Sequence, residues 1–284
     1  MRDRPDRPMN IVDSTVSSGE SDIFTLHRIN FRPPIELNFL MNSIDFLNTG
    51  TASEFVDALR VEVLQHPAVN HQFLYRLRHG LFPDMVAVLR DYAHQYSFYS
   101  RGFVKYLQSV IDNLPTQEQK DTLLENLIEE QGNLESSDLA ERPHVEIFDH
   151  FKGLVGADDA YAAQRPPSAT VEIWARLFDE KCQSNQVGIG LGAIGLATEN
   201  IVPVFYPCFA EAIDKFTELG SDASLFFRLH VDCDDGHGED LVEITKEIAE
   251  EPRNREAIRF GTISALNLRS AFWDSQLARS QQLV

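Results

Sequence analysis

Residues 225–241 read LFFRLHVDCDDGHGEDL and carry the clearest structural signal in the chain. The apolar residues at its start, with Leu241, Ile244 and Ile248 at its end and beyond, predict one long amphipathic helix. The middle of the stretch nevertheless holds two glycines, four aspartates and a pair of histidines. Gly costs about 1 kcal/mol relative to Ala inside a helix, and Asp is also a poor helix former. A packed helix that departs from local preference in this way usually does so for function.

Three side chains of this helix have the chemistry of metal ligands. His230, Asp234 and His237 stand at i, i+4 and i+7, which at about 100° per residue places them within a stripe roughly 60° wide. The alternative is a solvated acidic face with incidental histidines. Phe226 and Leu241 lie at a similar helical phase and are typical core residues, so the pattern favours a metal site facing the interior.

Further ligands must come from other helices, and three residues qualify. Glu130 closes an apolar helix that Thr116 can cap, and His144 opens the next helix after Pro143. Glu199 is a lone charge among small and apolar residues, and a buried carboxylate needs a partner or a metal. Taken singly, each also fits a simpler interpretation: a surface glutamate, a histidine at a helix start and a solvent-facing glutamate.

The rest of the chain predicts an all-α protein, a single bundle of seven or more helices. No alternating strand pattern or internal repeat is present. We expect residues 1–22 to form a disordered N-terminal arm. Residues 23–284 should form the helical domain, which begins with an irregular segment at 23–50. Helices are expected from a capping box at Thr51–Glu54, from Met85 to Ile111, from Ser168, over 189–219 and 222–250, and from about 253.

Bulk composition narrows the possible partners and compartment. The 284 residues carry a net charge of −19, which repels phosphate backbones, so we expect no nucleic-acid partner. No uninterrupted apolar run of about 18 residues is present, so we expect no membrane span. Three separated cysteines and no signal-peptide pattern are typical of a protein in the reducing cytoplasm.

The candidate ligands follow one another in the order and types of a known family: Glu130, His144, Glu199, His230, Asp234 and His237. This pattern resembles the haem-oxygenase-like diiron oxidases, whose relatives in fold are haem oxygenase, thiaminase II and pyrroloquinoline-quinone synthase. The resemblance covers roughly residues 54–275. The loop between the first Glu and His is longer than in the family, so Glu129 is an alternative to Glu130 as the ligand.

The resemblance implies a haem-oxygenase-like fold with two iron ions, cycling between Fe2+ and Fe3+, at these six residues. Manganese could replace iron in one of the two positions, since carboxylate and imidazole ligands suit both metals. Dioxygen would be the co-substrate, and the reaction N-oxygenation or oxidative C–C cleavage of an amino acid, an amine or a fatty acid. The same resemblance leads us to expect an external electron donor or reductase and allows a homodimer.

Two other enzyme types use comparable folds. A metal-free relative would be a thiaminase-II-like hydrolase with Cys208 or Cys233 as nucleophile, or a cofactor-free oxidase. A ferritin-like diiron protein requires two Glu-x-x-His motifs. Here only Glu141 and His144 have that spacing, with Pro143 inside the turn. A non-catalytic helical binding protein is the remaining alternative.

A glycine-rich stretch imitates a dinucleotide-binding motif. Gly190, Gly192 and Gly195 match G-x-G-x-x-G, but residues 183–186, just before them, do not form a strand pattern. We therefore expect these small residues to allow close packing between helices near the site.

Overall fold

The computed structural model describes residues 50–283, apart from the side chains of 232–237. Within that part the chain forms helices and no strands. The predicted arm, residues 1–22, and the segment 23–49 lie outside the described residues. The helices are α2 (Ala52–Gln65), α3 (Gln72–Arg78), α4 (Met85–Ser100), α5 (Phe103–Asn113), α6 (Gln117–Gln131), η1 (Leu139–Glu141), α7 (His144–Leu154), α8 (Asp159–Gln164), α9 (Ala169–Cys182), α10 (Val187–Leu191), η2 (Gly192–Glu199), α11 (Val202–Phe216), η3 (Ser221–Ser224), α12 (Leu225–Ala249) and α13 (Pro252–Ser280).

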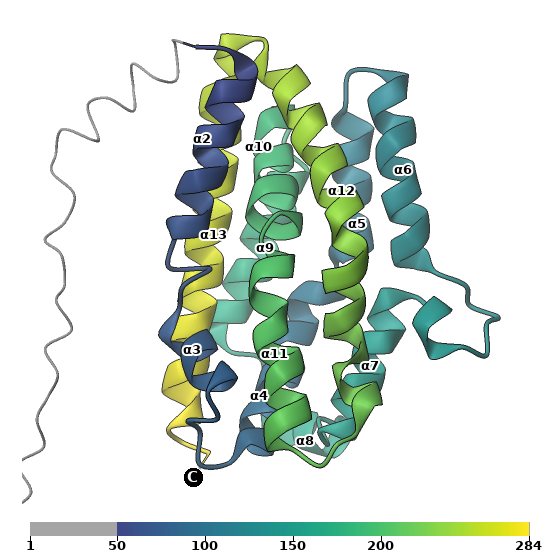
Figure 1. Cartoon of the computed structure of the whole chain (residues 1–284), viewed down its shortest axis with the longest axis vertical. Coiled ribbons are helices and arrows are strands. Elements are labelled where there is room, and N and C mark those ends of the chain that lie inside the picture. Colours follow the sequence, from purple (N-terminus) through teal and green to yellow (C-terminus); the bar gives the residue numbers. More distant parts are fainter. Residues whose placement is uncertain (1–49, 284) are drawn as a thin grey trace, which may run out of the picture.

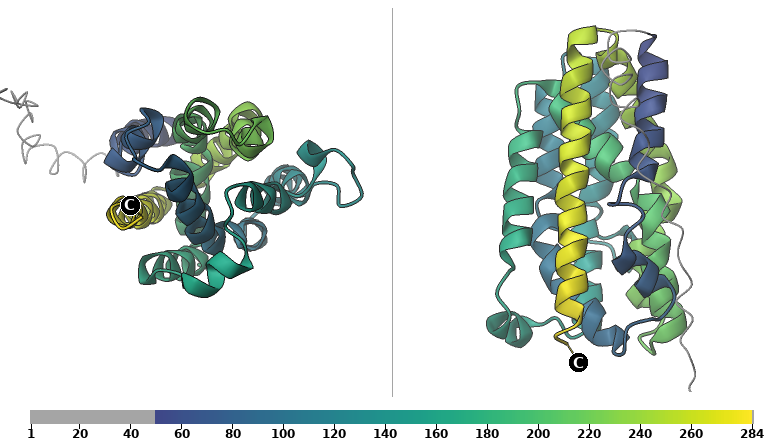
Figure 2. Two further views of the ribbon diagram at one scale, coloured as in Figure 1. Left: turned by 90° about the horizontal axis from the view of Figure 1, so that it is seen from below. Right: turned by 90° about the vertical axis from the view of Figure 1, so that its left-hand side faces the viewer.

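The long helices run side by side along one axis (Figure 1). The column formed by α10, η2 and α11 stands in the middle of the bundle, and α13 packs along α10 and η2. Seen end-on, α12 flanks α11, and α6 and α7 form an outer layer with the loop between them (Figure 2). The prediction of a single all-α bundle is therefore confirmed.

Local capping chemistry sets several helix boundaries as the sequence predicts. Thr51 and Glu54 form a reciprocal capping box at the start of α2. Thr116 and Ser168 accept backbone N–H groups at the first turns of α6 and α9. Gly132 ends α6 with a φ of 52°, which a residue with a Cβ rarely adopts. These predictions are confirmed.

Two predicted helices are broken, and both breaks lie beside the site. The helix expected from Met85 to Ile111 is interrupted at Arg101–Gly102. The helix expected over 189–219 consists of α10, the wide π-helical turn η2 and α11. Pro203 gives a reason for the second break, because a proline lacks an N–H and its ring clashes with the carbonyl at i−4, here that of Glu199.

Two glycines let α13 approach the central column at backbone distance. A Cβ added to Gly192 would lie 2.2 Å from the carbonyl oxygen of Ile258 on α13. A Cβ added to Gly261 would lie 2.1 Å from the carbonyl oxygen of Ile189 on α10. The expectation that the glycine-rich stretch serves close helix packing is confirmed at Gly192.

One segment, Val187–Phe216, is long and apolar enough to cross a membrane by length and composition alone. Of its most apolar window, 72% is buried inside the bundle, as is typical of a core helix. Glu199 interrupts the apolar residues here, so the sequence shows no continuous run.

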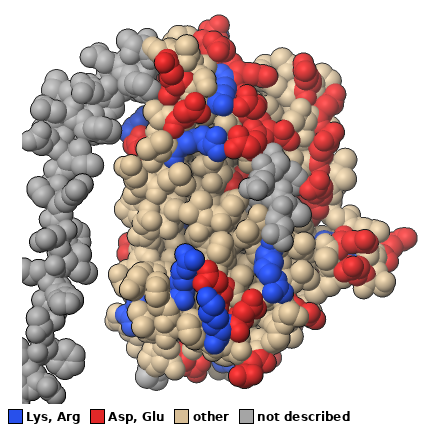
Figure 3. Space-filling view, viewed as in Figure 1, with Lys and Arg blue, Asp and Glu red and all other residues tan. Residues whose placement is uncertain are grey.

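Acidic side chains gather at the top and along the right-hand side of the visible face (Figure 3). Along α6 the exposed acids Glu118, Asp121, Glu125 and Glu129 form an outward stripe, at the right-hand edge of that view. The buried face of the same helix carries Leu123, Leu127 and Glu130. Glu130 is thus the one acid of this helix that its packing turns inward.

We predict that Gly261→Ala destabilises the protein by about 1–3 kcal/mol or more, because its methyl group would overlap the α10 backbone. The matched control is Gly153→Ala in α7, where nothing lies within 4 Å of the added Cβ. That change should be neutral or stabilising by up to about 1 kcal/mol. Urea unfolding followed by circular dichroism measures both, and equal effects would contradict the backbone contact.

Candidate metal centre

The carboxylate of Glu130 is turned into the bundle at the last turn of α6. The residue is 8% exposed, whereas its neighbour Glu129 is on the solvent side of the helix. Its Oε1 lies 3.0 Å from Nδ1 of His144, the first residue of α7. Of the two candidates for this position, Glu130 is therefore the one that belongs to the described cluster.

His144 reaches Glu130 because the loop between α6 and α7 closes on itself. The amide of Asn133 donates to the carbonyl of Glu141, with 2.7 Å between nitrogen and oxygen. A Cβ on Gly132 would lie 2.5 Å from the carbonyl carbon of Arg142 and 2.6 Å from the nitrogen of Pro143. Glycine is thus required both for the backbone angle and for the close passage of the segment that carries His144.

Opposing effects act on the protonation of His144. Burial disfavours the imidazolium and is the largest influence, but the hydrogen bond to Glu130 and the charges of Glu130 and Glu129 together outweigh it. The pKa of His144 is consequently raised above its usual value. The imidazole lies against a strongly electronegative site, which also attracts a metal cation.

His230 comes from the first half of α12 and is held by its own helix. Its Nδ1–H donates to the carbonyl of Phe226, with 2.7 Å between the atoms. This bond fixes the neutral tautomer in which Nε2 carries the lone pair, and Nε2 is the atom 4.0 Å from Oε1 of Glu130. The ring centroids of His144 and His230 are 4.6 Å apart.

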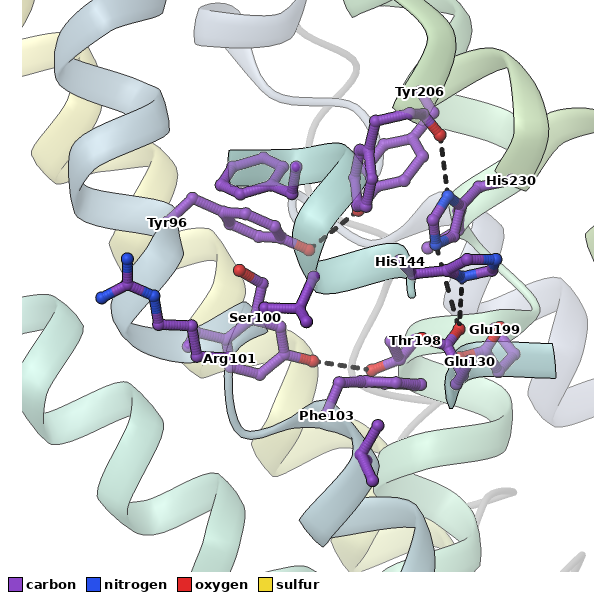
Figure 4. A pocket seen from close by; sticks show the side chains of 16 residues that line it. Tyr96, Ser100, Arg101, Phe103, Glu130, His144, Thr198, Glu199, Tyr206 and His230 are labelled. Atoms are coloured by element: carbon purple, nitrogen blue, oxygen red, sulfur yellow. Dashed lines mark hydrogen bonds and ion pairs between the residues drawn. The ribbon is translucent and has the colours of Figure 1, made fainter. Parts of the chain in front are cut away.

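Three potential ligand atoms thus converge from three separate helices (Figure 4). One donor atom from each of Glu130, His144 and His230 lies within 4.8 Å of the others. A carboxylate with two imidazoles is a donor set that suits iron, manganese or zinc better than soft thiolate-preferring metals. The residues present fit a metal ion.

Glu199 is the last residue of η2 and is 7% exposed. The wide turn is marked by the i−5 backbone hydrogen bond from the Asn200 amide to Gly195 O at 2.9 Å. The side-chain hydroxyl of Thr198 also donates to Ala193 O, at 3.0 Å. Burial, and then the charge of Glu130, raise the pKa of Glu199 to about 8, although Arg269 acts in the opposite direction. Glu199 is therefore electrostatically coupled to the same cluster.

Asp234 and His237, the other two predicted ligands, have side chains outside the described residues. The backbone of α12 nevertheless continues as a helix through them. A Cβ added to Gly238 would lie 3.8 Å from the carbonyl oxygen of Glu199, so this part of α12 passes directly beside η2.

The cluster opens onto a pocket of about 190 Å³. Its aromatic and apolar lining includes Tyr96, Tyr99, Phe148, Val202, Tyr206 and Phe226. The hydroxyls of Tyr96 and Tyr206 are 2.9 Å apart, and the Tyr206 ring meets the His230 ring edge to face with centroids 5.5 Å apart. The sequence predicts Tyr96 only as a core residue, because helical periodicity cannot tell a pocket wall from a packed core.

A buried arginine behind this wall was not predicted as part of the site. Arg269 of α13 is 1% exposed and donates to Tyr99 and Thr198 through Nη2, at 3.4 and 3.3 Å. Its guanidinium also lies over the ring of Trp174, 5.2 Å from the centroid. A buried positive charge therefore acts on the Glu199 carboxyl group. In the sequence it appears only as an arginine at a helix position that otherwise faces the core.

Of the two cysteine candidates, Cys208 gives no support for a nucleophile. Cys208 is buried, does not line the pocket, and its pKa is raised by burial, which disfavours the reactive thiolate. The side chain of Cys233 lies outside the described residues.

We predict that Gly132→Ala lowers iron affinity at least tenfold, because the loop can no longer bring His144 to Glu130. Gly220→Ala is the matched control, since Gly220 also has a positive φ, 81°, but nothing lies within 4 Å of its added Cβ. Both variants should lose about 1–3 kcal/mol to backbone strain. Iron titration separates them, and an unchanged affinity in Gly132→Ala would refute the role of the close passage.

Comparison with known proteins agrees with this geometry. A family described as iron-containing redox enzyme matches residues 90–270. A search of curated proteins gave no significant match.

Among solved structures, a TenA homolog from Pseudomonas syringae pv. tomato is 12% identical, with a TM-score of 0.60 over 80% of this chain and 91% of that chain. A domain of unknown function with a heme oxygenase-like fold from Shewanella denitrificans is 15% identical, with a TM-score of 0.60 over 88% and 95% of the chains. A CADD-like protein of unknown function from Nostoc punctiforme is 16% identical, with a TM-score of 0.64 over 81% and 98%. These likenesses show a haem-oxygenase-like fold. The chain belongs to the family of iron-containing redox enzymes.

Proposed function

We propose that the protein is a non-haem diiron oxidase or oxygenase that uses dioxygen to oxidise a small organic substrate. The observation that carries the proposal is the convergence of Glu130, His144 and His230 within 4.8 Å at one end of a pocket. The family match supports iron as the metal. Because the matching family is one of redox enzymes, the match also favours an oxidation over the hydrolysis that a metal-free thiaminase-II-like relative would catalyse.

The proposed ligands are the six predicted from sequence: Glu130, His144, Glu199, His230, Asp234 and His237. Glu130 lies at the centre of the described cluster, so its two oxygens could serve two ions. Asp234 and His237 share a helix with His230 at i+4 and i+7, and the same helix passes beside Glu199 at Gly238. This neighbourhood supports a second ion, with manganese as an alternative occupant of one position.

Two bound iron ions would supply the binding and reduction of dioxygen, with electrons from an external donor or reductase. The protein's own residues have three tasks around them. Phe148, Val202 and Phe226 exclude water from the pocket. Phe226 also orients His230 through its carbonyl. The paired hydroxyls of Tyr96 and Tyr206 can hold a proton at a fixed position beside His230.

The fold alone also fits a metal-free TenA-like enzyme. A hydrolase of that kind requires an accessible nucleophile. Of its two candidates, Cys208 is buried away from the pocket, whereas the side chain of Cys233 lies outside the described residues. The two free cysteines with described side chains, Cys182 and Cys208, are both buried, which supports the proposal of a reducing, cytoplasmic setting.

We predict two iron ions per chain after anaerobic reconstitution with ferrous iron, measured by elemental analysis. His230→Ala should lower iron affinity at least tenfold and abolish iron-dependent oxygen uptake with little loss of helicity. His150→Ala is the control, because His150 lies exposed on the helix that begins with His144. A plateau well below one iron per chain in the wild type would refute the diiron proposal.

We predict that iron binding at pH 7 releases protons and tightens as the pH rises toward 8. The Glu199 carboxyl has a pKa of about 8 without metal, so it is mainly protonated at pH 7 and must ionise to bind a cation. Calorimetry in buffers of different ionisation enthalpy counts the protons. Glu199→Gln should release fewer, and an equal release would remove Glu199 from the ligand set.

A further inference from the structure

The pocket has a second polar end, opposite the cluster. Ser100, Arg101, Phe103 and Val104 line it where α4 breaks and α5 begins. In Figure 4 the Arg101 guanidinium lies at the other side of the close-up from Glu130 and Glu199. A substrate in this pocket would therefore meet the metal ligands at one end and this junction at the other.

The hydroxyl of Ser100 differs from those of the other serines in α4 and α5. Ser97 on the same helix donates to the carbonyl of His94 at 2.7 Å, and Ser109 to that of Lys105 at 2.9 Å. Ser100 Oγ is buried and has no hydrogen-bond partner among the described residues. A buried polar group left without a partner costs about 1–3 kcal/mol, so its position on a pocket wall indicates a polar group of a ligand.

Positive charge is present at the same junction. Arg101 pairs with Asp149 of α7 at 3.2 Å, and Lys152 pairs with the same carboxylate oxygen at 3.4 Å. Two cations thus share one carboxylate, which leaves a net positive charge beside the pocket in a chain of net charge −19. The first turn of α5 adds its partial positive charge, because Gly102 provides no side-chain cap.

The space between the two ends is apolar and small. Phe148, Val202 and Phe226 line it, and its volume is about 190 Å³. An apolar cavity of about 150 Å³ can hold benzene, so by the same scale this pocket holds about eight non-hydrogen atoms. A ring or short chain fits, whereas a long-chain fatty acid exceeds the space.

We propose that Ser100 and Arg101 form a carboxylate-binding subsite, and that the substrate is a small aromatic or apolar monocarboxylate. Its carboxylate would accept hydrogen bonds from the Ser100 hydroxyl and the Arg101 guanidinium, and its apolar body would extend toward His144 and His230. The assignment as a substrate rests on the proposed function, but the binding site itself does not require iron.

The test uses the full-length, metal-free protein and two probes of the same shape, benzoate and benzamide, with affinities measured by NMR titration. The wild type should bind benzoate at least tenfold more tightly than benzamide. Arg101→Gln should abolish that preference, and Ser100→Ala should weaken benzoate binding three- to tenfold. Arg101→Lys, which keeps the charge, should retain most of the preference.

Arg78→Gln is the matched control. The Arg78 side chain is 49% exposed and paired with Glu211, as Arg101 is 51% exposed and paired with Asp149, but Arg78 does not line the pocket. Equal wild-type affinity for the two probes, or an unchanged preference in Arg101→Gln, would overturn the subsite. Iron loading, measured separately, should be normal in the Ser100 and Arg101 variants. Benzoate selectivity in a wild type that binds no iron would refute the proposed function while supporting the subsite.

Discussion

Glu130 and Glu199 place two carboxyl groups in the apolar interior of a helical bundle. The groups packed around them offset the electrostatic cost of that burial. Each glutamate is less than a tenth exposed, and the charge of Glu130 helps to raise the pKa of Glu199 to about 8. Ionising both carboxyl groups here would be costly unless positive charge lay close by. His144, with its raised pKa, and the buried Arg269 provide part of that charge. A bound cation would provide the remainder, which is why we regard the cluster as a metal centre rather than a structural ion pair.

The backbone departs from regular α-helical geometry at two places that position candidate ligands. At Gly132 the chain leaves α6 in a conformation that lets the Arg142–Pro143 backbone pass over it and returns His144 to Glu130. At η2 the helix widens, then ends before Pro203, and this turns Thr198 and Glu199 toward the pocket. The π-helical turn costs backbone stability, and such turns occur frequently at functional sites. The most irregular parts of the backbone are therefore those that position candidate ligands.

The sequence predicted the features that depend on local chemistry. Thr51, Thr116 and Ser168 cap helices because a side-chain oxygen can reach the backbone amides of its own first turn, wherever the helix packs. Glu130, His144 and His230 were identified from their residue types and order along the chain, and the structure brings these three together. The breaks at Arg101–Gly102 and in the 189–219 helix were missed, because a single glycine or a Pro203 can be tolerated in a helix when tertiary packing compensates.

The pocket wall was missed for a related reason. Tyr96, Tyr206 and Arg269 occupy positions with core periodicity, and only the three-dimensional arrangement shows that their polar atoms meet one another beside the cluster. No sequence pattern points to Ser100. It stands out only because its buried hydroxyl has no hydrogen-bond partner among the described residues, which a sequence cannot show. Long-range contacts of this kind depend on how helices far apart in the sequence are packed.

The most direct measurement is a crystal structure of the iron-loaded protein with anomalous scattering recorded at the iron absorption edge. We expect two anomalous peaks beside the Glu130 carboxylate. The imidazole nitrogens of His144 and His230 should lie about 2.1 Å from iron, as histidine nitrogens do from zinc. Peaks elsewhere in the bundle, or no ordered iron while Glu130 and His144 keep their direct hydrogen bond, would contradict the assignment of this cluster as the metal centre.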